Sequence, residues 1–397
     1  MQTTVEQFLE TLELAKGGRL ESTMSLVPIL QHFCFEKGWV FTYDDIVAVA
    51  AHNAGIDLKQ SLPVLLLDLL SSVKPTTEFS LKEEGESSVK LTGKKINAQF
   101  PSIAKSGYLT NIAELTKWHE AAKVKLPISY LYPDDYDLLT VMAQCFAQNT
   151  ALEMQAGVII ELGKQLQLTV TDNVTLTHYE RGLKKEKEPL CIIVPVKFFR
   201  ELSRLRTLID NEQVEKGMIH ISKSSISFNF GGKALLLCKC SEFKSKSKLD
   251  NIINQYPVKN LTKIPNAFRS AVQRAALLLK GPPSESKAAA LMKGEAYKNV
   301  QLIITEKTIS LKSVGHATKL DEAVAWKPKK WKGTIKTAVH IDSLSRAVGL
   351  FDSFSFEHSS RVIVFKTDNL THYISTMLAA DEPEVREEIE DTDDIPF

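Results

Sequence analysis

The chain has 397 residues, of which 44% are hydrophobic and 24% are charged, and its formal net charge is +1. This composition is typical of a globular protein, and the length predicts two to four domains. The longest apolar run, Leu62–Leu70, is interrupted by Asp68 and is too short to cross a bilayer. The N-terminal segment up to Lys16 carries three glutamates, which is not typical of a signal peptide. We therefore expect a cytoplasmic protein without a membrane segment.

The charge is unevenly distributed. Residues 384–397 contain seven acidic residues and one basic residue, Arg386, so the net charge of this segment is −6. The rest of the chain has 48 basic and 41 acidic residues, a net charge of +7. We predict a disordered acidic tail on a mildly basic body, which is compatible with a nucleic-acid partner. Among the cysteines, Cys238 and Cys240 have no second pair to complete a zinc site, so reduced thiols and no metal are expected.

One pattern recurs along the chain: an amphipathic helix followed by short strands with tight polar turns. It begins with a helix at Val5–Lys16, the segment Leu26–Phe35, a turn at residues 36–38 and a strand at Trp39–Tyr43. A second half of the same kind has a helix at Leu62–Val73. The strands of this half are expected at Glu78–Lys82 and Ser88–Leu91.

The same pattern returns twice. The later helices are predicted at Asp137–Phe146, Pro195–Ile209, Asn266–Leu279 and Ile341–Phe351. The strands that follow them are predicted at Gly157–Leu162, Leu166–Thr171, Met218–Ser222, Ile226–Phe230, Val300–Thr305, Ile309–Ser313, Ser353–Glu357, Arg361–Lys366 and Thr371–Met377. Such repetition predicts an α+β fold of three repeated domains, each with two helices and antiparallel sheets. Polar or proline-containing segments place the domains at 1–123, 124–258 and 259–383, before the tail at 384–397.

Three segments resemble the β sliding clamp of bacterial DNA polymerase, a processivity factor. Gln165–Asn173 resembles the family's strand that ends in a Thr-Asp-Gly turn, Ile192–Leu202 its strand before a Pro-initiated helix, and Leu370–Leu378 its closing strand. With the order of the half-units, the resemblance covers about residues 1–380. The chain departs from the family at residues 173–175, where Gly-His-Arg is usual, and at residues 376–378, where Met-Pro-Met is usual. This drift indicates a distant relative, and a phage origin would fit it.

The resemblance implies three-domain sliding-clamp repeats without enzymatic activity or cofactor. Two chains would form a head-to-tail homodimer ring around duplex DNA, tether a replicative DNA polymerase and depend on a clamp loader. Helices would line the hole and make weak, sequence-independent phosphate contacts. The basic residues expected to face DNA are Lys16, Arg19, Lys197, Arg200, Arg204, Arg206, Arg269, Arg274 and Arg346. For each of them, a solvated helix face is the alternative.

The resemblance also implies an apolar pocket for short partner peptides between the second and third domains. Its predicted lining is Val174, Leu176, Pro257, Ile374 and Thr376. Core packing is the alternative for Leu176 and Ile374. The end of the tail, Asp393, Asp394, Ile395, Pro396 and Phe397, resembles that of bacterial single-stranded-DNA-binding protein. An aromatic end group, a proline and acidic neighbours suit docking on an apolar pocket with a basic rim, so the tail is expected to recruit proteins that read such an end.

Other functions have weaker support in the sequence. A single-stranded-DNA-binding protein of unrelated fold would use aromatic residues among basic ones, as in Trp326–Lys332, although a loop is the alternative for that segment. A clamp-like decoy that binds host factors is a third hypothesis. Metal-binding acids could be sought at Asp44-Asp45 or Asp134-Asp135, but a turn and a helix N-cap are the preferred interpretations. The motifs of phosphate-binding loops, zinc proteases and serine hydrolases are absent from the sequence.

Overall fold

The structure is a computed structural model. It describes residues 3–20, 27–53, 56–94, 96–104, 112–131, 138, 142, 157–171, 174–209, 212–244, 246–279, 299–313, 320–328, 333–356 and 361–378. The predicted helix Asp137–Phe146, apart from Leu138 and Met142, and the acidic tail lie outside these residues. The chain divides into unit 1, Met1–Ala143 with Lys187–Phe243, and unit 2, Gln144–Glu186 with Lys244–Phe397. Within the described residues, no helix is long and apolar enough to cross a membrane.

Unit 1 begins with the predicted helix. Helix α1 spans Val5–Ala15 after strand β1 (Thr3–Thr4), and the Thr4 hydroxyl caps it by accepting a hydrogen bond from the Gln7 amide. The second helix, α2 (Leu66–Ser71), is shorter than the predicted helix Leu62–Val73. Leu62–Pro63 instead form strand β5 and pair with β2, so the helix begins only at Leu66.

Two antiparallel sheets build unit 1. The larger has the order β5, β2 (His32–Glu36), β3 (Trp39–Tyr43), β4 (Val47–His52), β16 (Ala234–Lys239), β15 (Ser225–Asn229), β14 (Met218–Ile221) and β9 (Val124–Pro127). The smaller has the order β1, β6 (Glu78–Glu84), β7 (Ser88–Gly93) and β8 (Ile96–Pro101). The turn between β2 and β3 falls where predicted, with Lys37 and Gly38 both at positive φ. Short 3-10 turns occur at Lys16–Gly18, Pro28–Gln31 and Ile128–Tyr130.

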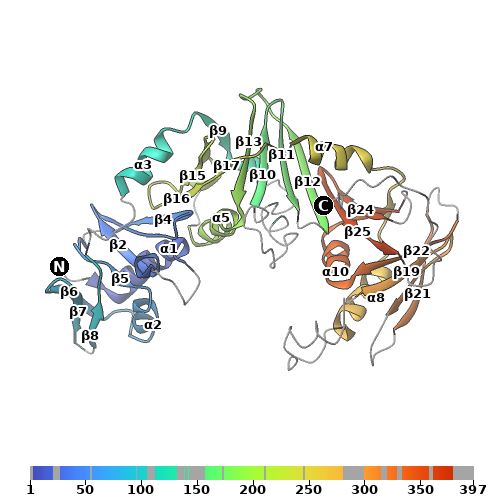
Figure 1. The fold of residues 1–397 in the computed structure, drawn as a ribbon. Coiled ribbons are helices and arrows are strands. Elements are labelled where there is room, and N and C mark those ends of the chain that lie inside the picture. The colour runs from blue at the N-terminus through green and yellow to red at the C-terminus, as the bar shows by residue number, and fades with distance from the viewer. Residues whose placement is uncertain are drawn as a thin grey trace. The chain divides into compact units, whose positions relative to one another are not determined.

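The larger sheet is covered on both faces, which explains why its strands are apolar throughout rather than alternating. On one face, Phe33, Phe35 and Val40 join the core that includes Phe8 and Leu12 of α1. On the other face, Phe41 and Leu237 pack with Leu115 of helix α3 (Ile112–Glu120). The sequence pattern did not predict α3, which ends just before the domain boundary expected after residue 123. Figure 1 shows α1 and α3 on opposite sides of these strands.

The next helix of unit 1 closely matches the predicted helix Pro195–Ile209. Helix α5 spans Val196–Leu208 after Pro195, whose fixed φ suits a helix start. Strand β13 (Leu190–Pro195) precedes it and pairs with β17 (Ser241–Glu242), and the short helix α6 (Glu212–Glu215) follows it. Phe198, Phe199, Leu202 and Leu205 of α5 are buried, as their helical spacing requires.

Unit 2 contains strands in two antiparallel arrangements. One runs β10 (Gly157–Leu162), β11 (Gln165–Thr171), β12 (Thr175–Gly182), β25 (Leu370–Ser375), β24 (Val362–Thr367), β23 (Ser353–Ser355) and β18 (Thr262–Lys263). The other runs β21 (Asp321–Ala325), β20 (Thr308–Ser313), β19 (Asn299–Ile304), β22 (Ile335–His340) and β26 (Met377–Leu378).

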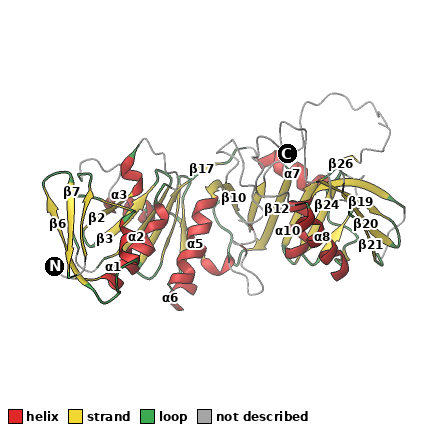
Figure 2. Ribbon diagram, turned by 90° about the horizontal axis from the view of Figure 1, so that it is seen from below, coloured by secondary structure: helices red, strands yellow, loops and turns green. Residues whose placement is uncertain are grey.

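Helices α8 (Asn266–Leu278) and α10 (Ile341–Leu350) match the predicted helices and lie side by side in Figure 1 and Figure 2. They contact strands of both arrangements: α8 packs on β20 and β21, α10 on β22 and β25. In unit 1, α1 likewise packs on α2, and their shared core includes Phe79 of the smaller sheet and Phe35 of the larger. The α+β fold with repeated units of helices and antiparallel sheets is thus confirmed, whereas the three domain boundaries stay a prediction.

Candidate nucleic-acid and partner interface

A salt bridge joins the start of the basic helix α5 to the turn between β3 and β4. The Lys197 ammonium donates to the Asp44 carboxylate and to the Arg19 carbonyl, both at 2.5 Å. The side chains of Lys197 and Asp44 are largely shielded from solvent, with 19% and 8% of their surface exposed. The other Asp44 oxygen accepts from the amides of Ile46 and Val47, so Asp44 closes the turn between β3 and β4. This confirms the turn interpretation of Asp44-Asp45.

Arg204 joins α5 to the C-terminal end of α1. Its guanidinium donates to the carbonyls of Glu13 and Leu14 at 2.7 and 2.9 Å and to the Glu201 carboxylate at 2.7 Å. The Thr42 hydroxyl donates to the Ala15 carbonyl, and the Lys16 amide donates to the Leu12 carbonyl. The last four carbonyls of α1 therefore all have partners, as a buried helix end requires.

Two glycines permit this close approach. A Cβ at Gly17 would overlap the Glu201 carboxylate, and a Cβ at Gly18 would overlap the Thr42 carbonyl. A side chain at Gly18 would push this turn away from the backbone of β3 and β4, and one at Gly17 would displace the Glu201 and Arg204 side chains that join α5 to α1. The Lys16–Gly18 turn is therefore part of the junction, and not a flexible linker.

The remaining basic residues of unit 1 differ in exposure. Arg200 is exposed and, within the described part of the chain, is not paired with an acid. Arg206 is half-buried and makes further interactions of its own. Lys16 pairs with Glu13 one turn earlier in α1, and the Arg19 side chain is half-buried. Arg200 is thus the residue of α5 that fits a phosphate contact best.

In unit 2 the helix cations are held by neighbouring groups. Arg269 donates to the Phe351 carbonyl at 2.6 Å and lies 3.9 Å from Asp352. Arg274 forms a two-bond pair with Glu322, at 3.0 and 2.5 Å, whose hydrogen bonds raise the pKa of Arg274 and lower that of Glu322. Arg346 donates to the Asp342 carbonyl of its own helix. A DNA-facing role stays a prediction for all these residues. Each of them already has an acidic or carbonyl partner within unit 2.

An apolar cluster lies on one face of the β12, β25 and β24 strands in unit 2. Leu176, Tyr373 and Val364 are opposite one another in the register and are buried. Helix α7 (Lys246–Gln255), also not predicted, covers them with Ile253, and Tyr256 and Val258 follow it. Burial, with a smaller effect of the Glu180 charge, raises the pKa of Tyr373 to about 12, so its hydroxyl stays neutral.

The predicted pocket residues fall around this cluster in different settings. Val174 is 45% exposed, Pro257 is exposed and Thr376 is half-buried. Leu176 and Ile374 are fully buried. Ile374 is opposite Thr175 and Ile363, so it lies on the other face of the strands from Leu176, and one pocket cannot include both. The partner pocket stays a prediction, now centred on the Leu176 face.

Of this cluster, only Leu176 was among the predicted pocket residues; the others are Ile253, Tyr256, Val258, Val362, Val364 and Tyr373. Alternation along β25 would have placed Tyr373 on the same face as Ser375 rather than Ile374. The helical spacing of Ile252, Ile253 and Tyr256 would have indicated an amphipathic helix at α7.

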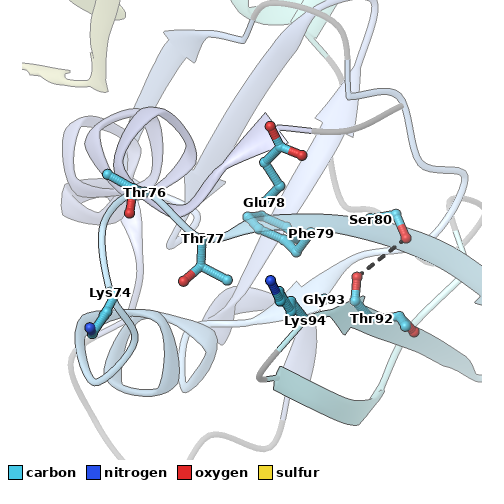
Figure 3. Close-up of a pocket in the computed structure, with 9 residues that line it drawn as sticks. All are labelled: Lys74, Thr76, Thr77, Glu78, Phe79, Ser80, Thr92, Gly93 and Lys94. Carbon is cyan, nitrogen blue, oxygen red and sulfur yellow. Dashed lines mark hydrogen bonds between the residues drawn. The ribbon is translucent and has the colours of Figure 1, made fainter.

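Two other features of the described residues bear on function. Trp326 is buried, donates its indole N–H to the Thr305 carbonyl at 2.7 Å and stacks on Phe354, so its ring is not presented for base stacking. A cavity of about 460 Å³ lies in unit 1 beside β6 and β7. Figure 3 shows Lys94 and Thr77 pointing into it, and its lining contains none of the residues predicted to contact DNA or partner peptides.

Comparison with known proteins finds a likeness in structure but not in sequence. No family model matches the chain. No curated protein matches its sequence. Solved structures do match along the whole length. A Pseudomonas aeruginosa sliding clamp (DNA polymerase III subunit beta) bound to griselimycin has a TM-score of 0.70 at 15% identity, with 96% of this chain and 99% of that chain covered. The DNA polymerase III beta subunit of Thermotoga maritima has a TM-score of 0.71 at 14% identity, with 96% and 99% covered.

The sliding clamp of Caulobacter crescentus also has a TM-score of 0.71 at 14% identity, with 95% of this chain and 99% of that chain covered. These identities are too low to show more than the fold. The coverage leaves almost no part of either chain unmatched, so the repeats occur in the same order in both. The chain therefore has the fold of the bacterial DNA polymerase III beta sliding clamps.

Proposed function

We propose that this protein is a DNA sliding clamp, a non-enzymatic processivity factor that encircles duplex DNA as a homodimer ring. The observation that supports this best is the whole-length match to beta clamps, with 96% of this chain and 99% of the Pseudomonas aeruginosa chain covered. A protein that shared only one domain with clamps would match a part of their length. Its partners would be a replicative DNA polymerase and a clamp loader.

The charges of the helices fit such a function. Of the basic residues expected to face DNA, Lys16, Lys197, Arg204, Arg269 and Arg274 are paired with acids. Each phosphate contact adds to salt-dependent affinity, so a surface with few unpaired cations binds duplex weakly. A ring that stays on DNA by topology needs only weak contacts, and weak contacts permit sliding.

Equilibrium binding without a loader separates this proposal from the single-strand-binding alternative. We expect linear duplex and single strand to bind equally weakly, with dissociation constants of about 10⁻⁴ to 10⁻⁶ M at physiological salt. Fluorescence anisotropy with labelled oligonucleotides measures both. Much tighter binding of the single strand would favour the alternative, for which the buried ring of Trp326 gives no support.

For partner peptides, we propose the surface around exposed Val174 and Pro257, beside the cluster of Leu176, Tyr256 and Tyr373. Apolar side chains at the edge of a buried cluster suit a short hydrophobic peptide. Val174→Glu should abolish capture of the polymerase in pull-downs, whereas the matched variant Leu65→Glu, at an exposed position of unit 1, should not. Equal capture by both variants would exclude this surface.

We also propose that residues 393–397 recruit proteins that read the end of single-stranded-DNA-binding protein. The acidic run before Ile-Pro-Phe supports this. Deletion of residues 393–397 should remove those proteins from pull-downs while polymerase capture persists. Unchanged recovery of all partners would show that the tail has no docking role.

A further inference from the structure

Two histidines are stacked between α3 and the larger sheet of unit 1. The rings of His119, near the end of α3, and His220, on β14, have centroids 4.0 Å apart and planes inclined by 7°. The His220 Nδ1–H donates to the His119 carbonyl at 3.0 Å, and His119 Nδ1 is 2.7 Å from the hydroxyl of buried Ser227. Ser227 is opposite His220 in the register, so one small cluster joins the helix to two strands.

The surroundings of His119 favour its neutral ring. Lys125 on β9 is opposite His220 in the register and adds a positive charge. On α3, Lys117 and Glu120 are exposed, and Lys239 on β16 is placed over Trp118 of α3, 5.6 Å from its ring. Burial, followed by the charges of His220 and Lys125, lowers the pKa of His119 to about 4. Protonation of both rings would put two like charges in contact, with a third nearby.

We infer that the His119–His220 stack is a proton-sensitive clasp that holds α3 on the sheet at neutral pH and releases it in mild acid. Beneath α3 lies the apolar face to which Leu115 and Trp118 contribute, together with Phe41 and Leu237. Release of α3 would expose this face without disturbing α1 and α5, which pack on the opposite side. The clasp would thus be a local opening, separate from unfolding of the unit.

The direction of the effect follows from proton linkage. The folded pKa of His119 lies below the ordinary value of 6.5, so the opened helix binds a proton that the closed one excludes. The clasp is therefore fully effective above about pH 6.5 and weakens as the pH falls toward 4. At pH 5.5 the opening equilibrium should rise about tenfold over its value at high pH.

Hydrogen exchange of the full chain tests this inference. The protection factors of α3 amides, corrected for intrinsic exchange, should fall about tenfold between pH 7.5 and 5.5, while those of α1 stay within about twofold. In the double variant His119→Gln/His220→Gln, which keeps hydrogen-bonding groups, the fall should disappear. It should persist in His52→Gln, which removes an exposed histidine from β4.

Two results would overturn the inference: equal protection of wild-type α3 at both pH values, or an undiminished fall in the double variant. If the double variant does not fold, His119→Gln alone serves, since it removes the group whose pKa is lowered and should reduce the fall to less than about threefold.

Discussion

At the scale of single residues, basic side chains expected to bind DNA instead stabilise the fold through contacts within the protein. Lys197 and Arg204 were predicted to face DNA because they are basic and lie on a helix with few acids. The structure places both against the end of α1, where they bind Asp44, Glu201 and backbone carbonyls. Sequence spacing gives the face of a helix on which a residue lies, but not the element that packs against that face.

Replacing Arg204 should therefore act on stability. Arg204→Met removes three hydrogen bonds and leaves Glu201 and the carbonyls of Glu13 and Leu14 without their partner. We expect the free energy of unfolding to fall by about 2–3 kcal/mol, since the pair is mostly shielded from water. Urea denaturation measures the change. Arg200→Met, on the same helix but exposed, should stay within about 0.5 kcal/mol. Equal effects of the two substitutions would refute the capping role.

His372 gives unit 2 a pH dependence of its own. It is fully buried, shares a hydrogen bond of 2.8 Å with the Thr177 hydroxyl and stacks on Phe351. Burial, with a smaller contribution from the charge of Arg346, lowers the pKa of His372 to about 3. The unfolded chain binds a proton near pH 6.5 that the folded chain excludes, so the stabilisation is complete above pH 6.5 and is lost as the pH falls.

As the pH falls from 6.5 to 5, the lowered pKa of His372 should reduce the free energy of unfolding by about 2 kcal/mol. Urea titrations at several pH values across this range give the free energy of unfolding as a function of pH. The slope of this plot should be smaller by about one proton in His372→Gln than in wild type, whereas exposed His52→Gln should keep the wild-type slope. An unchanged slope in His372→Gln would show that His372 is not the group that titrates.

At the scale of elements, hydrophobic periodicity predicted α1, α5, α8 and α10 to within about two residues, because each buries one apolar face. It overestimated α2, because Leu62–Pro63 pair with β2 as strand β5 and the helix begins only at Leu66. It missed α3 and α7, whose segments are rich in charged residues and read as linkers. Their apolar residues do recur at helical spacing, as Leu115 and Trp118 in α3 and Ile253 and Tyr256 at the end of α7 show, but the polar residues around them concealed this pattern.

The proposed partner surface depends on strand register in a related way. Motif positions assigned Val174, Leu176 and Ile374 to one pocket, but only Val174 and Leu176 lie on the same face. The register between β12 and β25 sets Ile374 on the opposite face, and sequence motifs do not contain this register.

The helices also allow a test of DNA contact. Arg200 on α5 is exposed, so Arg200→Gln should remove one phosphate contact. The slope of log K against log salt concentration for a linear duplex should then become smaller by about 0.9. Lys164→Gln, in the exposed turn between β10 and β11, removes the same charge and should leave the slope unchanged. A change of equal size in both variants would show that net charge, and not position, controls binding.

At the scale of the whole molecule, repetition carried the fold prediction. No single motif was specific, but the order of helices and strands over about residues 1–380 identified the clamp fold, which structures at 14–15% identity then confirmed. Periodicity survives such divergence because any apolar residue of suitable size maintains a buried face. Side-chain chemistry does not survive in the same way, so the match gives the fold and leaves the DNA and peptide contacts as proposals.

The most direct test of the central claim is retention on circular DNA. The protein is loaded onto nicked circular duplex with a matching clamp loader, separated from free protein, and the circle is then cut once with a restriction enzyme. We predict that the protein stays on the intact circle through gel filtration and leaves within minutes of linearisation, because a ring slides off a free end. Retention that is unchanged after the cut, or absent before it, would contradict the account.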